Sequence, residues 1–146
     1  MSRSGKRLSA RSKARKRAVD ALFAGNIRTM DAEQLLEQTL KQNVDRQNQE
    51  EIFDYARSLV TGFKQHQSSI DSKIELNSQG WRLDRMSNLD LSILRVACFE
   101  ILYNDEIPDA VAISEAKNLA DEYSTEESAK FISGILHAVS KSKEVI

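Results

Sequence analysis

Residues 88–103 read NLDLSILRVACFEILY, and no other stretch of the chain is so apolar. Its apolar side chains cover most of a helix circumference, and a helix that is apolar nearly all round lies in the middle of a domain. Ser87 and Asp90 form a capping pair of the kind that begins helices. We therefore expect a central buried helix over 88–103, with the other elements packed around it.

The segments on both sides of this stretch have apolar residues at intervals of three and four, which is the helical pattern. Five glycines and one proline leave few turn signals, and this also favours long helices. The sequence predicts an all-α fold of six to seven helices. The others are expected at about 10–24, ending at Gly25-Asn26; 31–42, capped by Asp31 with Gln34; a third capped by Asn48 with Glu51; a short one from Ile70 to about 77–80; 109–123; and a last one capped by Ser124 with Glu127. The polar residues 65–69 are expected to break or bend the chain between the third and fourth.

The charge is distributed unevenly along the 146 residues, a length that suits one domain. Residues 1–17 contain eight cations and no acid, whereas the chain as a whole has a net charge of −1, so the remainder carries −9. We expect a flexible basic N-terminal arm over 1–9, a single helical domain over 10–143 and a tail over 144–146. A basic segment on an acidic body favours polyanionic partners.

The chain offers little for catalysis or metal binding. Neither His66 nor His137 has a second ligand at metal-binding spacing, and Cys98 lies within the most apolar stretch, where packing is its expected role. The few glycines form no phosphate-binding loop, and no apolar run approaches the ~20 residues that span a bilayer. We expect no enzyme, cofactor, metal or membrane span, and a cytoplasmic protein. A start that is rich in Ser and Arg and free of acid is also typical of a transit peptide.

Besides the capping residue Asp90, two charged residues interrupt the apolar 88–103 stretch, and a buried charge requires a partner. We expect Arg95 to bond a carboxylate on a neighbouring helix, with Glu115 as the candidate. For Glu100, a structural role and a role facing a partner are equally compatible with the sequence.

The basic cluster is the one feature that indicates a class of ligand. Arg11 and Arg15 share a helical face, which Lys13, Lys16 and Arg17 widen. Such a helix can bind RNA phosphates, with release of condensed counterions. Localisation signals, membrane-surface patches and solubilising tails have the same composition, so a helical interaction protein with a basic address tail is a competing interpretation.

Four segments in order resemble the NusB family of bacterial transcription antitermination factors. They are ARKRAVDALF at 14–23, DLSILR at 90–95 followed by Glu100-Ile101, PDAVAISEA at 108–116 and SAKFISGIL at 128–136. The resemblance implies two small packed helical bundles and a non-enzymatic protein. It also implies binding to the boxA element of rRNA leader transcripts beside NusE, a small-subunit ribosomal protein, within an antitermination complex on RNA polymerase.

Carried over by position, the resemblance implies two groups of RNA-binding residues. The basic group is Arg7, Arg11, Lys13, Arg15 and Lys16, and the second group, around the start of the last helix, is Tyr123, Glu127 and Phe131. The bland alternative for Tyr123 and Phe131 is that they close the core. The chain departs from the family pattern at Glu127, Ser133 and Asp20, where Asp, Asn and an amide are usual.

The family resemblance has one alternative and leaves one property open. A similar helical module occurs at the N-terminus of an rRNA cytosine methyltransferase, so a stand-alone RNA-binding or interaction module without catalytic activity is the alternative. A homodimer is compatible with the resemblance, because family members occur as monomers and as dimers.

Overall fold

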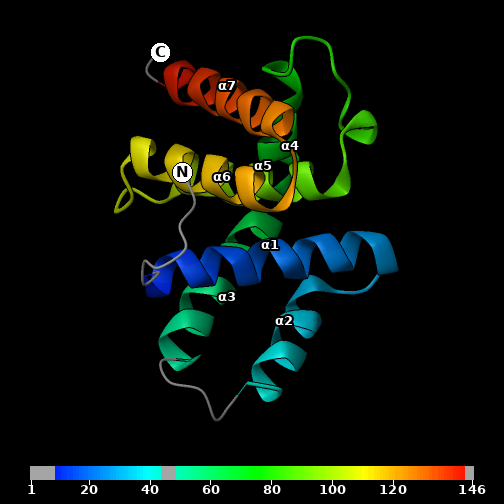
Figure 1. The fold of residues 1–146 in the computed structure, drawn as a ribbon, viewed down its shortest axis with the longest axis vertical. Coiled ribbons are helices and arrows are strands. Elements are labelled where there is room, and N and C mark those ends of the chain that lie inside the picture. The colour runs from blue at the N-terminus through cyan, green and yellow to red at the C-terminus, as the bar shows by residue number, and fades with distance from the viewer. Residues whose placement is uncertain (1–8, 44–48, 144–146) are drawn as a thin grey trace.

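The computed structural model describes residues 9–43 and 49–143, and within these ranges the chain forms seven α-helices, one short 3-10 helix and no strand (Figure 1). The fold is therefore all-α, as predicted. In chain order the elements are α1 (Ala10–Arg28), α2 (Ala32–Lys41), α3 (Gln49–Gln65), α4 (Gln67–Leu76), the 3-10 helix η1 (Leu83–Arg85), α5 (Asn88–Tyr103), α6 (Asp109–Tyr123) and α7 (Glu126–Ser142).

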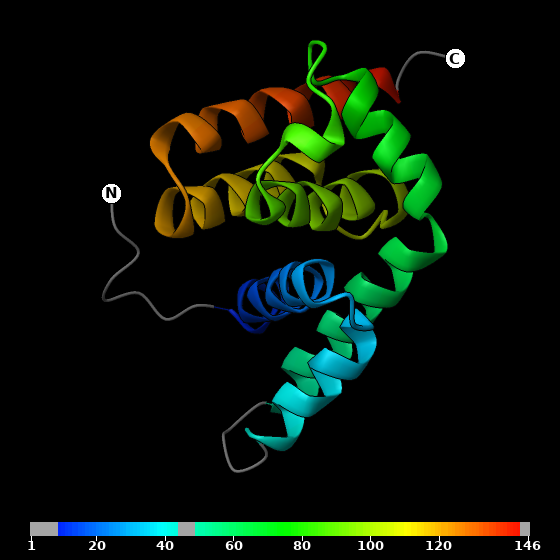
Figure 2. The same ribbon diagram turned by 90° about the vertical axis from the view of Figure 1, so that its right-hand side faces the viewer.

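The helices form two bundles, and α5 joins them. Helices α1, α2 and α3 pack together in one bundle, and α4, α5, α6 and α7 in the other. Helix α5 contacts both α1 and α3 across the boundary, and Figure 2 shows α1 lying against the layer formed by α5 and α6. One continuous apolar core runs through both bundles. The prediction that 88–103 is the central helix is confirmed, because its side chains contribute to the core on several sides.

Several predicted helix boundaries agree with the structure. The bounds of α6 are those expected, Asp31 caps α2, and the Ser87 hydroxyl accepts a hydrogen bond from the Asp90 N–H at the start of α5. The predicted cap of α7 was wrong: Thr125, not Ser124, accepts from the Ser128 N–H. The predicted cap of α3, Asn48, lies outside the described residues.

The predicted end of the first helix was also wrong. Helix α1 continues through Gly25 to Arg28, and its C-cap residue Thr29 adopts a left-handed φ of 54°. Gly25 serves close packing instead, because a Cβ at this position would lie 2.8 Å from the carbonyl oxygen of Met30. The chain can therefore turn back tightly into α2.

The predicted interruption between the third and fourth helices is confirmed at His66. This residue separates α3 from α4, and its ring stacks on that of Tyr103 with 3.8 Å between centroids. One turn earlier, Gly62 provides space for the Phe99 ring, whose nearest carbon would lie 2.2 Å from a Cβ at position 62. Helices α3 and α4 therefore follow one another along one side of the molecule, with a bend at His66 (Figure 2).

Candidate nucleic-acid interface

The basic residues of α1 point to different sides of the helix, so they are not equivalent. Lys13 is exposed, and the Arg11 side chain is 50% exposed and 3.9 Å from the still more exposed Glu106. Arg17 is half-buried, with its guanidinium over the Phe53 ring. Arg7, a predicted contact, lies outside the described residues.

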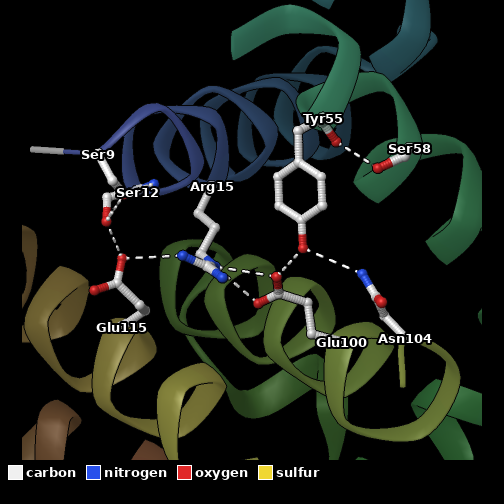
Figure 3. A network of polar contacts seen from close by, with 8 residues as sticks. All are labelled: Ser9, Ser12, Arg15, Tyr55, Ser58, Glu100, Asn104 and Glu115. Atoms are coloured by element: carbon white, nitrogen blue, oxygen red, sulfur yellow. Dashed lines mark hydrogen bonds and ion pairs between the residues drawn. The ribbon is translucent and has the colours of Figure 1, made fainter. Parts of the chain in front are cut away.

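Arg15 is buried, and this corrects the prediction that it contacts RNA. Its Nε donates to both carboxylate oxygens of Glu100, at 2.9 and 3.1 Å, and its Nη1 lies 3.2 Å from Glu115 (Figure 3). The residue is 4% exposed and Glu100 is fully buried. Burial alone would lower the pKa of Arg15, but the hydrogen bond and charge of Glu100 outweigh it and raise the pKa. The guanidinium is therefore committed to the fold.

This buried pair belongs to a network that connects α1 with α3, α5 and α6. The Tyr55 hydroxyl donates to Glu100. Burial, and to a lesser extent this hydrogen bond, raise the pKa of Tyr55. Ser12 donates to Glu115 at 2.5 Å, and the Ser9 hydroxyl caps α1 (Figure 3). The network fixes the first turns of α1 against the second bundle, and so fixes the direction in which the exposed cations project.

The other predicted structural residue, Arg95, has a different partner from the one expected. Its guanidinium makes two hydrogen bonds to Asp71 on α4, at 3.0 and 2.9 Å, and lies over the Phe63 ring. The prediction of a carboxylate on a neighbouring helix was correct in kind, but Glu115 was the wrong candidate. Glu100 and Glu115 both pair with Arg15 instead.

Lys16 connects the basic face of α1 with the end of α6. Its ammonium nitrogen lies 4.4 Å from the centroid of the Tyr123 ring and 2.6 Å from Asp20. Tyr123 is 47% exposed, so closing the core, the bland alternative for this ring, does not describe it. Two groups that are more than 100 positions apart in sequence thus meet at one surface.

The junction of α6 and α7 is held by a carboxylate that was predicted only as part of the cap of the 88–103 helix. Asp90, only 8% exposed, accepts hydrogen bonds from the hydroxyls of Ser124 (3.0 Å) and Ser128 (2.7 Å). Glu127 lies between these serines in the exposed first turn of α7, where the helix dipole favours an acid. These two hydrogen bonds hold the junction that carries the second predicted group, Tyr123, Glu127 and Phe131.

Phe131, the last predicted residue, is half-buried at the edge of the core and contacts a residue that the predicted site did not include. Its ring meets that of Trp81 edge to face, with 6.2 Å between centroids. Trp81 is 55% exposed. The sequence feature that could have identified Trp81 is a large aromatic residue beside Gly80 in a polar connecting segment.

Other kinds of site find no support in the described part of the chain. No group of three or more His, Cys, Asp or Glu side chains there could hold a metal ion. Cys98 is fully buried, and burial raises the pKa of its thiol. Among the described helices, none is long and apolar enough to cross a membrane.

Comparison with known proteins places these features in a family. A model described as the NusB family matches residues 12–141. The transcription antitermination protein NusB of a Nocardioides species is 44% identical over 136 residues, which are 93% of this chain and 97% of that protein. The corresponding protein of Leifsonia xyli subsp. xyli is 41% identical over the same share of this chain and 94% of its own.

Solved structures agree in fold. A structure of T. maritima NusB superposes with a TM-score of 0.80 at 36% identity and covers 90% of each chain. A chain from a crystal structure of antitermination factors NusB and NusE in complex with dsRNA has a TM-score of 0.81 at 23% identity, covering 91% of this chain and 97% of that one.

Proposed function

The chain belongs to the NusB family of transcription antitermination factors, which are not enzymes, and we propose that it binds the boxA element of rRNA leader transcripts together with NusE. In this proposal the complex joins RNA polymerase and keeps rRNA transcription processive. The related structure of NusB with NusE and dsRNA supports RNA and NusE as partners.

The observation that carries the proposal is the contact between Lys16 and Tyr123. It places one cation of α1, whose side chain is 32% exposed, 4.4 Å from an exposed aromatic ring. Cations bind phosphates and aromatic rings stack on unpaired bases, and single-stranded RNA presents both groups. Of the predicted RNA-binding residues, we retain Arg11, Lys13, Lys16, Tyr123, Glu127 and Phe131, with Arg7 untested, and we leave out Arg15.

The body of the protein suits a basic protein partner. Beyond residue 17 the chain carries a net charge of −9. Charge complementarity of this kind speeds association and selects against acidic partners. In the proposed complex the acidic surface receives NusE, while the α1 cations remain directed at RNA.

The test is RNA binding by an Arg11→Glu/Lys13→Glu variant, measured with boxA and scrambled RNA, with and without NusE, at several salt concentrations. Each phosphate contact to a single strand contributes about 0.7 to the slope of log K against log salt, so losing two contacts lowers the slope by roughly 1.4. Affinity should fall for both RNAs, because phosphate contacts carry no sequence information.

An Arg28→Glu/Lys41→Glu variant is the matched control in the absence of NusE. Both of its residues are exposed, at the ends of α1 and α2, and the change in net charge is identical. Equal slopes for the wild type and the Arg11/Lys13 variant, or an equal loss in the control, would contradict the proposed RNA surface.

A further inference from the structure

Trp81 is the only tryptophan of the chain, and it is 55% exposed although it is the largest apolar side chain available for the core. It lies between α4 and η1, in the segment that runs past α7 (Figure 1). It is not among the RNA-binding residues that the resemblance to the NusB family implies.

The backbone beneath this side chain is held by a tight turn. The Trp81 N–H donates to the carbonyl oxygen of Ser78 at 3.2 Å, and the hydroxyl of the buried Ser78 donates back to the Trp81 carbonyl oxygen. Gln79 and Gly80 between them adopt left-handed φ values of 55° and 90°. The backbone that carries the indole is therefore already ordered before a ligand binds, which lowers the entropic cost of binding.

The geometry of the aromatic pair leaves a stacking surface. The rings of Trp81 and Phe131 are inclined by 72° with 6.2 Å between centroids, so one ring presents its edge to the face of the other. Whichever ring presents the edge, at least one face of the indole is not covered by Phe131. A nucleobase can stack on an exposed aromatic face of this kind.

Each residue of the pair has an exposed cation next to it in the sequence. Arg82 follows Trp81 and Lys130 precedes Phe131, and their side chains are 75% and 76% exposed. Their acidic neighbours, Asp84 at 3.4 Å and Glu126 at 3.9 Å, are also largely exposed, and exposed ion pairs of this kind contribute little. Both cations can therefore turn to a phosphate at small cost.

The α6–α7 junction links the pair to the proposed RNA surface, because α6 ends at Tyr123 and the next helix contains Phe131. Asp90 holds Ser124 and Ser128, which are the residues next to Tyr123 and three positions before Phe131. Tyr123 and the Trp81–Phe131 pair therefore lie on either side of the α6–α7 junction that Asp90 holds.

From this arrangement we infer that Trp81, supported by Phe131, stacks on an unpaired base of the bound RNA. The inference rests on the proposed function and adds to it the residue that contacts a base. A base on the indole, with its phosphates at Arg82 and Lys130, extends the RNA path from α1 across the α6–α7 junction to the η1 segment.

Intrinsic fluorescence tests the inference directly, because Trp81 is the sole tryptophan. Titration with a single-stranded boxA RNA should quench the indole emission of the wild type. Trp81→Ala should weaken binding about 5- to 150-fold, as expected for the loss of one base–aromatic stack, and Trp81→Phe should restore most of the affinity. The salt slope should stay unchanged in both variants, because no charge is removed.

Leu76→Ala is the matched control, since Leu76 is an exposed apolar residue (78%) on the neighbouring α4; it should bind as the wild type does. Far-ultraviolet circular dichroism verifies the fold of each variant. Salt-dependent RNA binding with neither quenching nor more than a twofold loss in Trp81→Ala would overturn the inference and leave the proposed function standing. A loss of NusE binding alone would assign Trp81 to a protein contact and overturn it too. Absence of salt-dependent binding by the wild type even with NusE present would contradict the proposed function itself.

Discussion

Replacing the buried Arg15–Glu100 pair in a double-mutant cycle separates the structural role of this arginine from a role in RNA binding. The variants are Arg15→Met, Glu100→Leu and the double replacement. The two side chains are 5% and 1% exposed and share two hydrogen bonds of 2.9 and 3.1 Å. Each single change leaves one charge buried without its main partner.

The expected magnitudes follow from that geometry. Breaking a buried ion pair costs about 3–5 kcal/mol of unfolding free energy. Glu100→Leu should lie near the lower end, because Glu115, 3.2 Å from Arg15, still compensates part of the charge. In the double variant no unpaired charge remains at these two positions, so its loss should be at least ~2 kcal/mol smaller than the sum of the single losses.

Urea denaturation at pH 7, followed by circular dichroism, measures these free energies. RNA binding by the double variant should keep the wild-type salt slope, because Arg15 does not reach solvent in the native fold. A loss below about 1 kcal/mol in either single variant, or additivity within ~0.5 kcal/mol, would refute the reasoning about the pair. A reduced salt slope in the folded double variant would refute the assignment of Arg15 to the fold.

Two further predictions concern backbone space and acid stability. Gly62→Ala should lower the free energy of unfolding by about 1–3 kcal/mol, because the new Cβ would lie 2.2 Å from a ring carbon of Phe99. Gly134→Ala, where nothing lies within 4 Å of the new Cβ, should raise it by roughly 0.5–1 kcal/mol. Urea midpoints that shift in the same direction in both variants would contradict this. The hydrogen bond from Lys64 lowers the pKa of Glu33 in the native state, so the unfolded chain takes up protons first and stability is lost as pH falls below about 4.5. Lys64→Gln should make the fall of the melting temperature between pH 5 and pH 3 shallower, and an unchanged or steeper profile would exclude this linkage.

The buried network separates the residues of α1 that hold the fold from those that face solvent. Ser12 and Arg15 attach one side of the helix to Glu115 and Glu100, while Lys13 on another side stays exposed. Arg15 and Glu100, at the centre of the network, do not reach solvent. The network holds the helix in place, so that the cations which face solvent have a defined position relative to Tyr123.

Local patterns in the sequence determined the helices and their order. The spacing of apolar residues depends only on the helical period, and the Ser87 cap involves a residue three positions away, so both can be read without knowing the fold. The same holds for the excess of cations before residue 18 and for the burial of 88–103. These features, with four family-like segments, sufficed for the all-α fold and the family.

Which cation faces which partner was decided only by the tertiary structure. Arg15 and Lys13 belong to one basic run, yet the first bonds Glu100, 85 positions away, and the second reaches solvent. A helical period fixes the angle between two side chains but not what lies opposite either of them. For the same reason Asp71 could not be identified as the partner of Arg95, nor Trp81 as that of Phe131: these contacts join different helices and connecting segments, and only packing the bundles together brings them within reach.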